Sequence, residues 1–256
     1  MKKLTKTLVA ATLALGAASA NASILTANDM SGEAWLSVYD KTSRQTFTLD
    51  LGVAGVTAGY LFNQRATTNS FLNVDLSQFA DWNTFKSTAN LATTQYVVVA
   101  TGQTPDFSQQ VMFTGAGATK FNGLGLDVIA AAKSNIDVHV KNINSDSSAS
   151  QDPSVNDTTL AVDKDGIHIG QHNEGAGSGL LWGGVAYNPN GKYGSAVDFQ
   201  LANIDFATFT AQQTQFSMQF KLAGDTLSTV PVPAAVWLFA SAILGLAGVS
   251  RKRKAV

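Results

Sequence analysis

The chain of 256 residues contains no cysteine, and this absence removes several kinds of chemistry at once. Without thiols there is no thiol protease, no redox pair and no cysteine-ligated zinc, and the core must form without disulfides. Charge is scarce too: Asp, Glu, Lys and Arg make up 14% of the residues, against roughly 25% in an average globular protein. So low a charged fraction argues against a disordered polyelectrolyte and a coiled coil.

Positive charge is scarce in the interior of the chain. Seven of the 17 basic residues lie at its two ends: Lys2, Lys3, Lys6, Arg251, Lys252, Arg253 and Lys254. The interior contains the remaining ten basic residues and all 18 acidic residues, so its formal charge is −8. A phosphate-binding surface needs the opposite sign, and we therefore expect no nucleic acid among the partners.

Residues 1–22 have the three zones of a secretory signal peptide. A positively charged start precedes the apolar stretch Leu8–Ala18, and Ala20 and Ala22 are the small residues that signal peptidase accepts. The apolar stretch is short for a hydrocarbon core of about 30 Å. We predict that this segment directs export of the chain across the inner membrane. Signal peptidase would then cleave after Ala22 and expose Ser23.

A second apolar segment, Ala234–Val249, lies close to the C-terminus and contains no charged residue. As a helix it would be about 24 Å long, which predicts a transmembrane helix over 234–249. The basic tail 251–254 would stay in the cytoplasm by the positive-inside rule. Pro231 and Pro233 stop the helix from extending outward and favour an extended, protease-accessible segment. An ordinary stop-transfer anchor is the alternative.

The order of these C-terminal features resembles a known sorting signal. Val230-Pro231-Val232-Pro233-Ala234, the apolar helix and the basic tail are similar to the VPLPA variant of the PEP-CTERM signal. The resemblance implies recognition by exosortase, a membrane-embedded protease of Gram-negative bacteria, with cleavage near Pro231–Pro233. It also implies a transient inner-membrane precursor, then delivery to the cell surface or to an extracellular, exopolysaccharide-containing matrix. It covers 230–256 and does not bear on the activity of the preceding residues.

The segment between the two signals, residues 23–229, is predicted to be a single, mainly β domain, which we call the passenger domain. Alternation of apolar and polar residues, or runs of β-branched residues, predict strands at 34–39, 45–51, 96–100, 136–140, 197–201 and 216–222. Short strands separated by Gly, Asn, Asp and Ser favour an antiparallel β-sandwich or a jelly roll.

Two segments predict short helices instead. Phe79, Trp82 and Phe85 recur every three residues within 76–91, and a second helical pattern occupies 124–135. The polar run 142–159 has almost nothing to bury and predicts a long exposed loop.

The residues that carry chemistry form no catalytic motif. Ser178 lacks the flanking glycines of a nucleophile elbow. His168 and His172 would lie about 13 Å apart in an extended chain, too far to share one metal. We expect no cofactor and no metal; an irregular calcium site is the alternative, with Asp157, Asp163 or Asp165 as ligands.

These features predict a non-enzymatic surface or matrix protein that is processed by signal peptidase and exosortase. A carbohydrate-binding module is the first alternative, in which Trp82 or Trp182 stacks on sugar rings. Core tryptophans are the plainer interpretation of the same residues. A secreted hydrolase is the second alternative, since paired catalytic carboxylates meet only in three dimensions.

Overall fold

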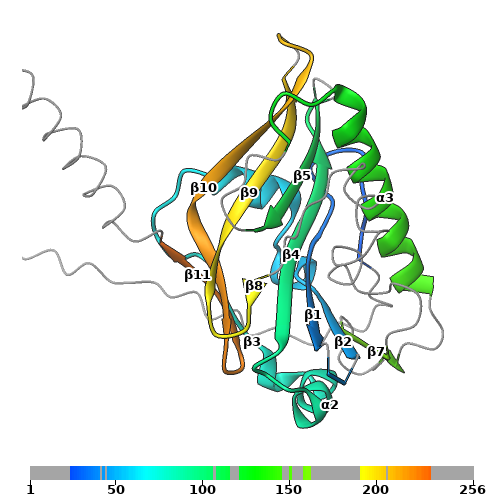
Figure 1. The fold of residues 1–256 in the computed structure, drawn as a ribbon, viewed down its shortest axis with the longest axis vertical. Coiled ribbons are helices and arrows are strands. Elements are labelled where there is room, and N and C mark those ends of the chain that lie inside the picture. The colour runs from blue at the N-terminus through cyan, green and yellow to red at the C-terminus, as the bar shows by residue number, and fades with distance from the viewer. Residues whose placement is uncertain are drawn as a thin grey trace, which may run out of the picture.

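A single antiparallel sheet organises the fold (Figure 1). The computed structural model describes residues 24–40, 42–43, 45–105, 108–115, 121–145, 150–151, 158–162, 191–205 and 207–231. Within these residues eleven strands form the sheet, in the order β3-β11-β10-β9-β5-β4-β1-β2-β7-β6, and β8 also pairs with β4. The strands are β1 (Ala34–Asp40), β2 (Gln45–Asp50), β3 (Asn73–Asp75), β4 (Thr94–Gln103), β5 (Gln109–Thr114), β6 (Ser150–Gln151), β7 (Thr158–Val162), β8 (Gly191–Lys192), β9 (Ala196–Asp205), β10 (Thr210–Ala223) and β11 (Thr226–Pro231).

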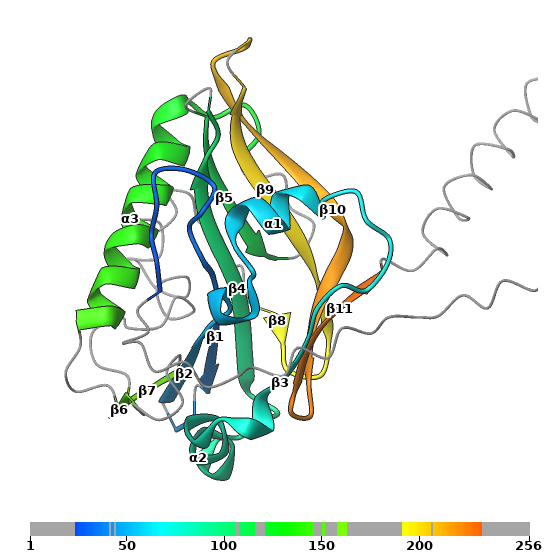
Figure 2. The same ribbon diagram turned by 180° about the vertical axis from the view of Figure 1, so that it is seen from behind.

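Helices lie on both faces of this sheet (Figure 2). α1 (Ala58–Asn63) and α2 (Ala80–Thr88) contribute to the core on one face, and α3 (Leu126–Ser145) contributes to the core on the other. Two short 3₁₀ turns, Gly52–Ala54 and Leu76–Gln78, precede α1 and α2.

The prediction of a mainly antiparallel β fold is confirmed, but the prediction of two packed sheets is wrong. One continuous sheet connects β3 to β6 through hydrogen-bonded neighbours. A sandwich buries one face of each sheet against the other, whereas this sheet buries both of its faces against helices and loops.

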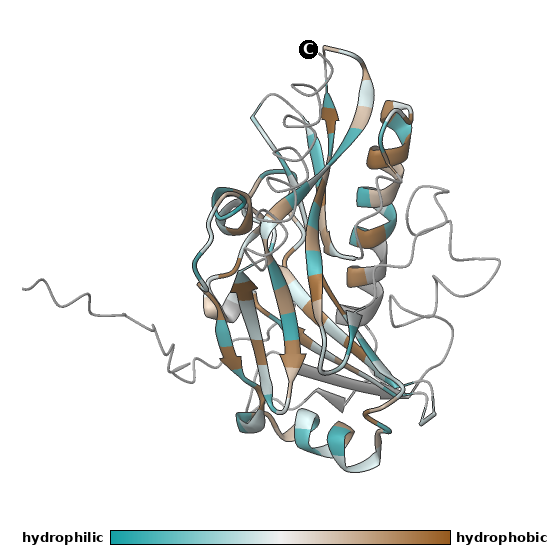
Figure 3. Cartoon of the chain, turned by 60° about the vertical axis from the view of Figure 1, so that its left-hand side comes forward, coloured by the Kyte–Doolittle hydropathy of each residue, from teal (hydrophilic) through white to brown (hydrophobic). Residues whose placement is uncertain are grey.

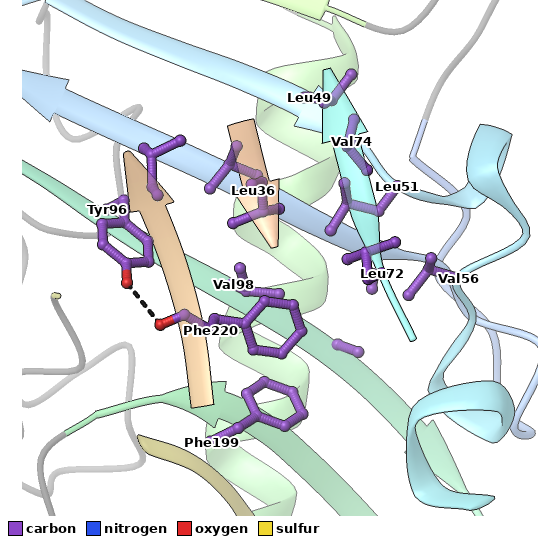
Figure 4. Close-up of a cluster of buried hydrophobic side chains, with 14 of the residues drawn as sticks. Leu36, Leu49, Leu51, Val56, Leu72, Val74, Tyr96, Val98, Phe199 and Phe220 are labelled. Atoms are coloured by element: carbon purple, nitrogen blue, oxygen red, sulfur yellow. Dashed lines mark hydrogen bonds between the residues drawn. The ribbon is translucent and has the colours of Figure 1, made fainter. Parts of the chain in front are cut away.

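The core on the α1 and α2 side is rich in aromatic residues (Figure 4). The ring of Phe199 lies 4.8 Å from the rings of both Phe216 and Phe220, in edge-to-face arrangements. The hydroxyl of Tyr96 donates a hydrogen bond to the carbonyl oxygen of Phe220 at 2.9 Å. Burial of that hydroxyl raises the pKa of Tyr96.

An irregularity in β10 bends the sheet around this core. The register with β9 shifts between Gln215 and Gln219, so three residues of β10 face one residue of β9. In the bulged segment, the amide of Ser217 donates to the carbonyl of Arg65 at 3.1 Å, which ties β10 to the end of α1. Bulges bend a strand and increase its twist, and here the sheet curls into an open half-barrel.

The core on the opposite face is closed by α3. Ile129, Ala132, Ile136 and Val140 are buried, and their spacing follows the helical period. Figure 3 shows apolar and polar residues alternating around this helix.

The strand predicted over 136–140 is therefore wrong, because these residues belong to α3. Five residues that alternate in polarity match a strand locally, but the longer spacing back to Ile129 fits only a helix. The predicted loop 142–159 is wrong at both ends. α3 continues to Ser145, Ser150–Gln151 forms β6, and β7 begins at Thr158. The helix predicted within 76–91 is confirmed as α2. The other predicted strands lie within β1, β4, β9 and β10, except that the strand predicted over 45–51 extends one residue past β2.

A buried carboxylate organises the chain where β1 ends. Asp40 is fully buried and accepts hydrogen bonds from the amides of Ser43 and Asn90 at 2.8 and 3.0 Å, and from the hydroxyl of Thr93 at 2.8 Å. Burial alone would raise the pKa of Asp40, but these hydrogen bonds outweigh it and lower the pKa to about 2.

This carboxylate makes stability depend on pH. Because the folded pKa lies below the unfolded value, Asp40 stabilises the fold above pH 4, and this contribution is lost as the pH falls towards 2. We expect Asp40→Asn to cost roughly 1–3 kcal/mol at pH 7, since the amide nitrogen cannot accept from backbone N–H groups. Urea unfolding of the wild type and of Asp40→Asn at several pH values should show that the difference between their free energies of unfolding becomes smaller towards pH 2. A difference that stays constant would mean that the charge of Asp40 is not its source.

Candidate functional site

The β9–β10 hairpin extends past the ends of the neighbouring strands (Figure 1). β11 pairs with β10 only from Met218 onward, so the distal half of β10 has no strand on that side. A turn at 121–125 takes this place: the amide of Gly123 donates to the carbonyl of Ala211 at 2.9 Å, and the amide of Ala211 donates to the carbonyl of Leu124 at 2.8 Å. Gly123 has a φ of 76°, which glycine adopts without strain.

One face of this hairpin carries polar side chains in register, all but one of them uncharged. Gln110, Asn203 and Gln212 are paired across β5, β9 and β10, and therefore lie in one row on the same face. The same face continues towards the tip and along β10. We call this set the polar strip; its residues are Gln110, Asn203, Asp205, Thr210, Gln212 and Thr214.

The single carboxylate of the polar strip is already engaged. Asp205 accepts hydrogen bonds from the side-chain amide of Gln212 at 2.6 Å, the hydroxyl of Thr208 at 3.0 Å and the backbone amide of Ala207 at 2.9 Å. The hydroxyls of Thr208 and Thr210 lie 2.8 Å apart. These contacts hold the tip in one arrangement and leave its surface dominated by amides and hydroxyls.

A groove of about 320 Å³ lies between the hairpin and the 121–125 turn. The described residues that line it are all uncharged: Asn122, Gly123, Thr208, Thr210, Ala211, Gln212 and Gln213. The side-chain oxygen of Gln213 accepts from the amide of Phe121 at 3.3 Å, while its Nε2 is buried and finds no acceptor among the described residues. Gln110 is likewise buried with its Oε1 unpaired in the described part of the chain.

Phe209 stands at the tip, between two residues that line the groove. Its side chain is 64% exposed, and its backbone is left-handed, with a φ of 53°. It is the only non-glycine residue with a positive φ in the described part of the chain. For a bulky residue this conformation costs about 1–2 kcal/mol. Burial of the ring does not offset this cost, because the ring is exposed. Such strain around an exposed aromatic ring is a feature of binding sites rather than of cores.

The sequence-predicted tryptophan at 82 is part of the core. Trp82 has no exposed surface and packs 5.3 Å from the ring of Phe47 and 5.6 Å from that of Phe85. Its ring is therefore not presented to a sugar, which corrects its assignment as a glycan-stacking residue. Tryptophans were the stacking candidates predicted from the sequence, and Phe209 was not among them.

The other predicted positions divide into two groups. Val230 and Pro231 lie in β11, where they pair with Gln219 and Met218. The remaining ones fall outside the described residues: Ala20, Ala22, Ser23, Asp157, Asp163, Asp165, Trp182, Pro233, Ala234, Arg251, Lys252, Arg253 and Lys254.

A second polar cluster joins α2 to the β10–β11 turn. Lys86 and the indole nitrogen of Trp82 both donate to the carboxylate of Asp225, the indole at 2.8 Å, and these bonds lower the pKa of Asp225. The hydroxyl of Tyr193 donates to the carbonyl of Gly224 at 2.7 Å. Each group serves a contact between elements, so the cluster is structural.

Two features are absent from the part of the chain that the structure describes. No three His, Cys, Asp or Glu side chains come together there as ligands of a metal would. None of the helices there is both long and apolar enough to cross a membrane.

Comparison with known proteins gives no match: no family model, no curated protein and no solved structure is detectably similar to this chain.

Proposed function

We propose that the chain is a non-enzymatic surface or matrix protein, exported with a signal peptide and processed by exosortase at its C-terminal tail. The proposal rests on the order of the predicted segments: a signal peptide over 1–22, and a Pro-x-Pro motif, apolar helix and basic tail over 230–256. The described sheet ends with β11 at Pro231 and so includes only the first two residues of this signal.

The position of β11 is the observation that best supports this arrangement. Thr229 is buried, and its hydroxyl accepts hydrogen bonds from the amides of Phe71 and Leu72, each at 3.0 Å. β10 pairs with β11 up to Pro231, whereas β3 pairs with it only up to Ser228. β11 thus extends two residues past 229, the predicted end of the passenger domain, and removal of the residues beyond 233 would leave every described strand in place.

Loss of a C-terminal tag tests the processing. With one epitope tag after Val256 and another in the exposed 66–70 segment, we expect mature protein outside the inner membrane to keep the internal tag and lose the C-terminal one. Substitution of both Pro231 and Pro233 by alanine should leave a tagged, membrane-held precursor. Immunoblots of membrane, surface and medium fractions measure both outcomes.

The control is a variant with a substitution on the same strand that leaves the motif unchanged, such as Ser228→Ala, which should be processed like the wild-type chain. Surface protein that still carries the tag after Val256 would contradict exosortase processing. Retention of all the protein in the inner membrane would favour the stop-transfer anchor instead.

A further inference from the structure

We propose that the tip of the β9–β10 hairpin is a binding site for a neutral polysaccharide, formed by Phe209, the polar strip and the adjoining groove. The inference rests on the proposed function only for the source of that polymer, the extracellular matrix. The site itself is argued from its charge, its hydrogen-bonding groups and its exposed ring.

The charge of the site selects an uncharged ligand. None of the described residues that line the groove is Lys or Arg, so these residues offer no counter-charge for an acidic polymer or a phosphate. The one carboxylate nearby, Asp205, already accepts three hydrogen bonds, which leaves it poorly placed to attract a cation. A ligand of this site is therefore recognised through hydrogen bonds and apolar contact.

The hydrogen-bonding groups match a ligand with many hydroxyls. A side-chain amide presents both donors and an acceptor, and a threonine hydroxyl serves as either. The groove and the outer part of the strip combine four such amides and three such hydroxyls, none of them fully buried: Asn122, Asn203, Gln212, Gln213, Thr208, Thr210 and Thr214. The Nε2 of Gln213, which lines the groove, adds one donor that the described residues leave unused.

Phe209 supplies the apolar contact that such a site needs. A sugar ring has an apolar face of C–H groups, and a flat aromatic ring covers it. The left-handed backbone at Phe209 sets the ring at the tip of the hairpin instead of in the core. The groove volume of about 320 Å³ falls at the lower end of the range for ligand sites, roughly 300–1,000 Å³.

Affinity electrophoresis tests this proposal with defined polymers. The full-length chain, purified in detergent, is run through gels that contain dextran, galactomannan or a soluble β-glucan, each neutral, or alginate, which is acidic. We expect retardation by at least one neutral polymer and none by alginate. Phe209→Ala should weaken the binding at least about tenfold, and Gln212→Ala should weaken it as well.

Two matched variants separate binding from folding. Leu25→Ala removes the other large hydrophobic side chain that is exposed in the described part of the chain, and it should bind like the wild type. Phe209→Gly relieves the backbone strain, so it should melt at an equal or higher temperature and still lose binding.

Any of three results would overturn the proposal: no retardation by any of the neutral polymers, a folded Phe209→Gly variant that binds like the wild type, or equal retardation by alginate. The last would contradict it because none of the described residues of the groove is a cation that could recognise that polymer. Since the assay uses the unprocessed chain, its failure is distinct from a failure of the tag experiment.

Discussion

Replacing Trp82 by alanine is expected to lower the free energy of unfolding by about 3–5 kcal/mol. The ring is fully buried between Phe47 and Phe85, and its indole nitrogen donates to Asp225 at 2.8 Å. Truncation removes these contacts and leaves a cavity between α2 and the sheet. Urea unfolding followed by circular dichroism measures the loss as a shift of the midpoint.

Trp82→Phe separates packing from hydrogen bonding. Phenylalanine keeps an aromatic ring against Phe47 but cannot donate to Asp225, which retains its contact with Lys86. A cost of roughly 1–2 kcal/mol is expected. If the alanine variant cost less than about 1 kcal/mol, the ring would not be a core residue. If the folded alanine variant lost polysaccharide binding while Phe209→Ala kept it, the sugar-stacking interpretation of Trp82 would be restored.

The strands could be predicted because their signal is local. Phe47, Leu49 and Leu51 alternate with polar residues, and the structure buries all three on one face. Residues 136–140 carry the same alternation, yet they lie in α3, because Ile129 and Ala132 extend the apolar face at helical spacing. A period of two and a period of 3.6 agree over a few residues, and only a longer window separates them.

The number of sheets could not be predicted from the sequence in the same way. A strand pattern reports which residues are buried, but it does not report whether a sheet or a helix buries them. Here α3 covers the face that contains Val99 and Phe113, where the sandwich interpretation required a second sheet. The bulge at 215–219 then bends one sheet where a sandwich would need two.

The hairpin site depends on pairing between distant segments. Gln110 and Asn203 lie far apart in the sequence, and only the register of β5, β9 and β10 places them beside Gln212. The exposure of Phe209 is equally non-local, because its neighbours in the fold decide whether a phenylalanine is buried. One signal was available: an aromatic residue between two threonines in a short turn that joins two strands of polar alternation.

Removal of the Asp137 carboxylate should destabilise the fold by about 3–5 kcal/mol, because it leaves a buried ammonium group without its partner. Lys133 is 4% exposed and donates to Asp137 at 2.6 Å, from the preceding turn of α3. The hydroxyl of Thr101 on β4 donates to the other oxygen of that carboxylate at 2.7 Å. The pair therefore joins α3 to the sheet beneath it. Asp137→Ala, compared with the wild type in urea unfolding, measures the effect.

A double substitution identifies which group causes the loss. Lys133→Met together with Asp137→Ala removes both charges and keeps an apolar side chain of similar length under α3. A buried ion pair replaced by apolar residues is often neutral or stabilising, so this variant should recover most of what Asp137→Ala loses. The coupling in the double-mutant cycle should then exceed about 1 kcal/mol. A double variant as unstable as Asp137→Ala alone would place the cost in the lost contact with Thr101, and α3 would depend on that hydrogen bond rather than on neutralisation of Lys133.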